Sequence, residues 1–224
     1  MFPASRFAFL AVLGTLLLHA PAAAAAAAAA GDDAFELWLN PAASFDIDDD
    51  TGVEIETAQR LRSASDGRAD TYYARLWLNQ ELSDTFTLSG GAERRINDGD
   101  DDETRFMQQL STRHGVLRTR LRLEQRLVDG SGRMGLRLRS RLGAAIPLDS
   151  RWSLQGSAEL FLTLRSTSTG GKDGLTGLRA QLGASYALSD HVSLTVGYLR
   201  QQELIDGAPD RVGHAPLVGI EWSL

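Results

Sequence analysis

The residues of this chain whose types and spacing suggest chemistry are arginines that recur at every second position. They are Arg118, Arg120, Arg122, Arg126, Arg137, Arg139 and Arg141, with Glu124 in the same series. A guanidinium stays protonated in a protein, and its planar fork binds carboxylates and other oxyanions with two parallel hydrogen bonds. The series therefore predicts either an ion-pair network or a basic surface that attracts anions.

Other chemical signals are weak. The chain has no cysteine, which excludes disulfides, thiolate metal sites and cysteine nucleophiles. His114, His191 and His214 match no metal spacing. Ser189, Asp190 and His191 are consecutive, whereas a catalytic triad needs residues that converge from separate segments. We therefore predict no catalytic residues, no cofactor and no metal, and expect a protein that is not an enzyme.

The arginines lie on segments that alternate between apolar and polar residues. Leu117, Leu121, Leu123 and Leu127 share one parity, and the arginines between them share the other. Successive side chains of a strand point to opposite faces, so each segment has one apolar and one charged face. The same alternation recurs from residue 51 to the end of the chain, which predicts an all-β protein.

The lengths of the segments and of their connections indicate which β architecture this is. The clear segments reach the nine to eleven residues, roughly, that a membrane strand needs. Short connections such as Leu82–Thr85 and Pro147–Arg151 alternate strictly with longer ones such as Asn97–Asp102 and Ser166–Gly174. This alternation is typical of an antiparallel transmembrane β-barrel with short periplasmic turns and longer outer loops. A secreted soluble sandwich is the rival interpretation, but it has no reason to keep the alternation.

The number of strands is expected to be even, because both ends of the chain should lie in the periplasm. Residues 51–224 supply ten crossings. Residues 31–50 form either a further hairpin, which gives twelve strands, or a periplasmic or plugging segment, which leaves ten. We favour twelve, because an unpaired alternating segment would leave backbone groups open at an edge.

In such a barrel the arginines must face the lumen, since a guanidinium is costly in hydrocarbon. The connection at Asp129–Gly132 sets a register with Glu124 opposite Arg137, Arg122 opposite Arg139, and Arg120 opposite Arg141. The last two pairs are like-charged and need carboxylates from neighbouring strands. Glu159 is expected to face Arg139, and Glu93, Glu81 and Glu221 are further inward candidates. These charges either close a narrow lumen with ion pairs or line a channel for anions.

The first thirty residues read as a cleaved signal peptide. Arg6 precedes an apolar run from Phe7 to Leu18, and an alanine tract from Ala22 to Ala30 follows. This is the order of charge, short apolar core and small residues that a secretory signal has. A single anchor helix that continues through the alanines is the alternative. Residues 31–224 are expected to form one domain, exported to the outer membrane.

The pattern resembles the domain-of-unknown-function (DUF) 2490 family of predicted Gram-negative outer-membrane β-barrel proteins. The resemblance covers most of the exported chain. It rests on Trp38, Gly90–Arg95, Thr104–Leu110, Arg118–Arg126, Arg137–Arg141 and Gly197–Gln202. Members often carry a histidine in the segment where this chain has Arg105 and Phe106. The family implies a barrel and brings no assigned activity.

We therefore expect a structural envelope protein or a narrow porin-like channel with an arginine- and glutamate-lined lumen. A barrel hydrolase that acts on surface lipid or peptide is the alternative. The expected partners are the outer-membrane bilayer, periplasmic chaperones and the barrel-assembly machinery during biogenesis, and small anionic solutes. Nucleic acid is not expected, because the exposed loops are acidic, including Asp98, Asp100, Asp101 and Asp102. We expect these loops to be exposed to solvent. The alternative is that their clustered carboxylates recruit divalent cations.

Overall fold

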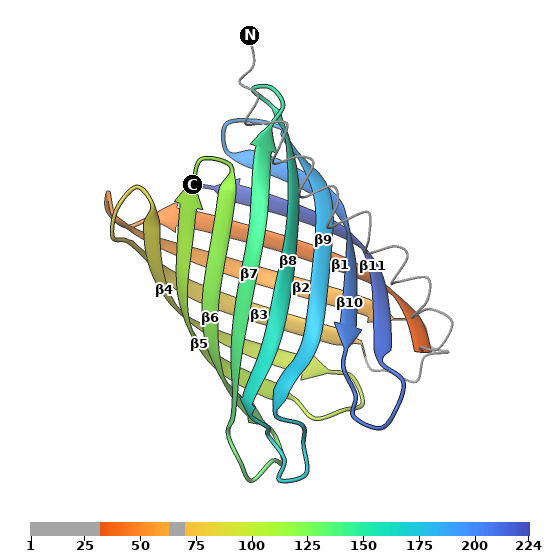
Figure 1. Ribbon diagram of the computed structural model, residues 1–224. Helices are drawn as coiled ribbons and strands as arrows, with labels where there is room; N and C mark the ends of the chain where they lie inside the picture. Colours follow the sequence, from red (N-terminus) through yellow and green to blue (C-terminus); the bar gives the residue numbers. More distant parts are fainter. Residues whose placement is uncertain (1–31, 63–69) are drawn as a thin grey trace.

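The computed structural model describes residues 32–62 and 70–224, which form a closed β-barrel (Figure 1). Its strands are β1 (Asp32–Asp46), β2 (Thr51–Arg62), β3 (Thr71–Glu81), β4 (Phe86–Asn97), β5 (Glu103–His114), β6 (Leu117–Val128), β7 (Gly135–Pro147), β8 (Trp152–Arg165), β9 (Gly174–Ala187), β10 (Val192–Glu203) and β11 (Arg211–Ser223). The expected signal peptide, residues 1–30, lies outside the described residues. No helix among the described residues is long and apolar enough to cross a membrane.

Neighbouring strands pair in chain order, and the barrel closes between β11 and β1. The pairs from β1–β2 through β10–β11 are antiparallel, which confirms the predicted all-β barrel. Short turns such as residues 82–85 and 148–151 alternate with longer connections such as residues 98–102 and 166–173, as the sequence predicts. The barrel therefore has a short-turn rim and a long-loop rim.

Two details of the predicted topology are wrong. The described residues form eleven strands, not an even number, and β1 pairs with β11 in parallel. Residues 34–46 belong to one continuous strand instead of a hairpin or a plug, and Pro41 is accommodated within it. Both edges of β1 are paired, so no open edge remains even though the count is odd. As a consequence β1 begins at the long-loop rim, so the two ends of the barrel-forming segment lie at opposite rims.

The outer surface is apolar around its middle. Large aliphatic side chains on successive strands are exposed there, namely Leu76, Leu88, Leu121, Leu142, Leu160, Leu182 and Val196. Aromatic side chains stand at both rims: Trp152, Tyr186 and Trp222 at the short turns, and Phe35, Tyr72 and Phe106 near the long loops. An apolar band between two aromatic girdles is the surface that a membrane barrel presents to lipid.

The side chains of the opposite parity point into the barrel. Trp38, Trp77, Met107 and Phe161 are buried there, together with eleven charged side chains of the strands. A Cβ on Gly91, the register partner of Trp77, would lie 2.4 Å from the indole ring. Only glycine therefore lets the ring of Trp77 lie flat against β4.

Candidate functional site

The arginine strands β6 and β7 pair in the predicted register. Glu124 lies opposite Arg137, Arg122 opposite Arg139, and Arg120 opposite Arg141. Only the first of these pairs joins opposite charges, so the other two depend on carboxylates that arrive from elsewhere.

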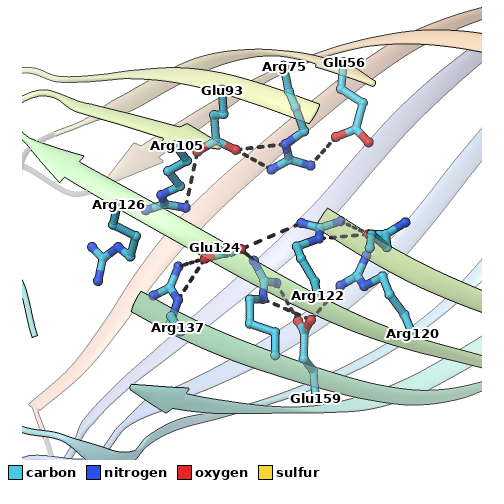
Figure 2. A network of polar contacts seen from close by, with 12 residues as sticks. Glu56, Arg75, Glu93, Arg105, Arg120, Arg122, Glu124, Arg126, Arg137 and Glu159 are labelled. Atoms are coloured by element: carbon cyan, nitrogen blue, oxygen red, sulfur yellow. Dashed lines mark hydrogen bonds and ion pairs between the residues drawn. The ribbon is translucent and has the colours of Figure 1, made fainter. Parts of the chain in front are cut away.

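Glu124 is the buried centre of this pair of strands. Its side chain has no exposed surface, and it accepts hydrogen bonds from Arg137 at 2.6 Å and Arg139 at 2.8 Å (Figure 2). The guanidinium of Arg122 lies 3.9 Å away and donates instead to the amide oxygen of Gln109, at 2.7 and 2.8 Å. One carboxylate therefore serves two arginines directly and a third only weakly.

Glu159 on β8 is shared in the same way. Its carboxylate lies 2.6 Å from Arg120, 2.7 Å from Arg139 and 3.6 Å from Arg179. The contact between Glu159 and Arg139 is the one predicted from sequence. It is diagonal, because the direct register partner of Glu159 is Arg141.

A second group of ion pairs joins β2 to β6. Glu93 on β4 is buried and accepts from Arg75 at 2.5 Å, Arg95 at 2.9 Å and Arg105 at 3.2 Å. Glu103 on β5 binds Arg105 and, at 2.5 Å, Arg126. Arg75 also reaches Glu56 on β2 at 2.5 Å. Figure 2 shows the two groups side by side on the inner wall of the barrel.

Sequence reasoning missed several members of this wall. Arg60, Arg75, Arg95, Arg105, Arg179, Glu56 and Glu103 all belong to it but were not among the predicted lumen residues. The signal that identifies them is strand parity. This signal is weak for Arg105 and Glu103, because the segment from Glu103 to His114 alternates between apolar and polar residues less clearly than the others.

Aromatic side chains fill the space between the guanidinium groups. The guanidinium carbon of Arg60 lies 3.8 Å from the centre of the Trp38 ring, and that of Arg179 lies 5.0 Å from it. Arg122 on β6 lies 4.7 Å from the Trp77 ring on β3. The contacts of Arg179 with Trp38 and of Arg122 with Trp77 join strands that are not neighbours in the barrel, so they narrow the lumen.

A cavity of about 1170 Å³ lies inside the barrel. Its lining includes Ala42 and Glu221 towards the short-turn rim, and Lys172 and Asp206 in the long loops. A second cavity of about 740 Å³ opens towards the connection at residues 98–100. Eleven arginines from β2–β9 line the larger cavity: Arg60, Arg75, Arg95, Arg105, Arg120, Arg122, Arg126, Arg137, Arg139, Arg141 and Arg179.

Nine of these eleven arginines pair with five carboxylates, which are Glu56, Glu93, Glu103, Glu124 and Glu159. Among the described residues, Arg60 and Arg141 have no carboxylate within 4.0 Å. The wall thus carries an excess of fixed positive charge. Such a surface attracts anions and repels cations.

Three other predicted residues lie near the short-turn rim. Arg118 donates to the carbonyl oxygens of Gly115 and Leu117 at 2.5 and 2.8 Å, at the short-turn rim, and does not line either cavity. Glu221 lines the large cavity near that rim, whereas Glu81 is exposed at the end of β3.

The opposite wall of the lumen, from β9 through β11 to β1, is mostly neutral. Gln181, Thr195, Leu199, Gln201, Leu217 and Gly219 line the cavity there. Trp38, Leu199, Ala215 and Leu217 pack into a small apolar cluster on this wall. Its charged members are Arg179, Glu203, Arg211 and Glu221, so this side of the lumen is sparsely charged, and we call it the neutral wall.

The histidines and the acidic loops have other surroundings. His191 Nδ1 lies 3.0 Å from the backbone oxygen of Ser223, and His214 Nδ1 lies 2.5 Å from the Tyr198 hydroxyl. Within the described ranges, no three histidine or carboxylate side chains gather into a group that suits a metal ion.

In the long loops, hydrogen bonds from Arg94 on β4 hold the pKa of Asp129 below its ordinary value.

Comparison with known proteins places the chain in a family without an assigned activity. The family model described as "Protein of unknown function (DUF2490)" matches residues 35–211, so the chain belongs to that family. An uncharacterised protein of Methylorubrum extorquens is 27% identical over 178 residues, which cover 74% of this chain and 77% of the relative.

Among solved structures, the fold is similar to that of the NanC porin. The two chains superpose with a TM-score of 0.55 and 12% sequence identity, over 82% of this chain and 91% of the porin. At this level of identity the likeness concerns the fold alone.

Proposed function

We propose that this member of the family is a narrow, porin-like channel of the outer membrane that favours small anions. The observation that carries the proposal is the imbalance on the lumen wall, where five glutamates pair with nine of eleven arginines and leave Arg60 and Arg141 without a carboxylate among the described residues. A packed structural network would match its charges, because a buried charge without a partner is costly. Anions and water in the lumen would solvate the arginines that have no glutamate partner, which accounts for the excess of positive charge.

The outer surface supports the membrane location. An apolar band flanked by aromatic rims has no use in water but matches a lipid bilayer. The signal-like first thirty residues agree with export, and the predicted partners follow from that route: the bilayer itself, periplasmic chaperones and the assembly machinery. Similarity to a porin fold supports the barrel architecture and does not identify the solute.

The alternative hydrolase has less support. The neighbouring residues Ser189 and His191 interact through the backbone amide of His191, and the imidazole is directed to a backbone oxygen instead. The Tyr198–His214 pair stands on the outward parity of β10 and β11, away from the cavity. We therefore propose transport and not catalysis.

Efflux of solutes from vesicles tests the proposed function. Mature protein is refolded into liposomes that contain gluconate, glucose or protonated glucosamine, three solutes of similar size and different charge. Gluconate should leave fastest and glucosamine slowest. Gln181 lines the cavity from the neutral wall, so Gln181→Trp should slow all three solutes by filling the lumen. Retention of all three solutes by the unmodified protein, or preference for glucosamine, would contradict the proposal.

A further inference from the structure

The two cavities share a common set of lining residues, which marks the passage between them. The shared residues are Trp38, Arg60, Arg95, Arg105, Arg126, Leu199, Gln201, Glu203 and Arg211. We call the part formed by Trp38, Arg60, Arg95, Arg105 and Leu199 the waist. A solute that moves from one cavity to the other contacts these side chains.

The carboxylates near the waist are already engaged. Glu93 accepts from Arg75, Arg95 and Arg105, and Glu103 binds Arg105 and Arg126. Arg60 is left without an ion pair among the described residues, and its Nε is buried with no hydrogen-bond acceptor. Its side chain is nevertheless nine-tenths buried.

The surroundings hold Arg60 in a fixed place. Its guanidinium lies over the Trp38 ring at 3.8 Å, and Trp38 is its register partner on β1. The indole Nε1 of Trp38 donates to Glu36 at 2.7 Å, which fixes the ring in turn. A guanidinium that is ordered in advance loses less entropy when it binds a ligand.

We propose that the waist is a binding site for a small oxyanion, of the carboxylate, sulfate or phosphate class, centred on Arg60 and assisted by Arg95. The proposal deepens the proposed function, since it adds a discrete site to a lumen that attracts anions in general. The bound anion supplies an acceptor to the guanidinium of Arg60, and Leu199 and Gln201 on β10 line the passage beside the neutral part of the solute. The site is saturable, whereas a diffuse excess of charge is not.

Binding to the refolded protein in detergent is measured by isothermal titration calorimetry with sodium sulfate and with sodium acetate, and with acetamide as the neutral analogue of acetate. At least one of the two anions should bind with a saturable isotherm, and acetamide should not. Arg60→Gln should weaken the binding by about tenfold or more, which corresponds to about 1.4 kcal/mol. Arg60→Lys should restore only part of it, because lysine keeps the charge and loses the fork.

Arg118→Gln is the matched control, because it removes the same charge from an arginine that lines neither cavity. It should bind the anion as the unmodified protein does. Saturable binding that Arg60→Gln leaves unchanged overturns the site, and so does the absence of saturable binding by both anions. Solute efflux separates this from the proposed function: anion-selective efflux without saturable binding refutes only the site. Binding that depends on Arg60 without any efflux refutes only the channel.

Discussion

The two walls of the lumen differ in how they are built and in what they contribute. The wall from β2 to β8 is made of long charged side chains that contact one another across strands, as Arg139 does with Glu124 and Glu159. The wall from β9 through β11 to β1 carries short or neutral groups, including Gly183, Gly197 and Gly219. The charged wall supplies the electrostatic field and fixes the barrel from inside. The neutral wall leaves the space in which that field can act on a solute.

The largest expected effect is the loss of a shared carboxylate on the charged wall. Glu124→Gln should destabilise the barrel by about 3–5 kcal/mol, because Arg137 remains buried without its carboxylate and Arg139 keeps only Glu159. Urea unfolding in lipid vesicles measures this, followed by the gel shift between boiled and unboiled protein. Gln181→Ala on the neutral wall is the control and should change stability far less. Equal losses of stability in Glu124→Gln and Gln181→Ala would show that the two walls do not differ in their contribution to stability.

The next largest effect is a difference in stability between substitutions at two adjacent residues, one on the outer face of the barrel and one on the inner face. Leu142 is exposed on the outer face, so Leu142→Arg should cost about 2–4 kcal/mol by placing a charge in lipid. Arg141 faces the lumen without an ion pair among the described residues, so Arg141→Leu should alter stability by only about 0.5 kcal/mol. The same unfolding assay compares them. The assignment of faces is inverted if Arg141→Leu is the more damaging change.

A moderate effect is expected on selectivity. Gln181→Glu places a negative charge on the neutral wall and should lower the preference for gluconate over glucosamine in vesicle efflux. The preference of the unmodified protein should also fall as salt rises from about 0.1 M to about 1 M, because the screening length shortens from about 10 Å to about 3 Å. If neither Gln181→Glu nor the higher salt concentration changes the preference for gluconate, the preference comes from pore size and not from charge.

The smallest effect concerns the long loops. The carboxyl of Asp129 keeps its pKa below the ordinary value because Arg94 donates a hydrogen bond to it. A depressed pKa adds stability that is present above the ordinary value and is lost as the pH falls through the lower folded value. Arg94→Gln should return the pKa of Asp129 to its usual range, as followed by NMR titration. An unchanged pKa would mean that the contact is not maintained in solution.

The sequence predicts the barrel and part of its inner face, because strand parity and the alternation of short and long connections depend only on local residue types. The register of β6 and β7 followed from one connection at Asp129–Gly132. The strand count did not follow, because Pro41 resembles a break although the strand continues through it and pairs on both sides. The roles of Arg60 and Glu103 depend on contacts between strands, and one sequence alone does not give the contacts between distant strands.

We propose that the charged wall governs the passage of ions through a water-filled lumen. The most direct test is the reversal potential of the refolded protein in a planar lipid bilayer under a potassium chloride gradient. Chloride should carry most of the current, so the reversal potential should lie towards the chloride equilibrium potential. A silent bilayer, or a reversal potential towards that of potassium, would contradict the account.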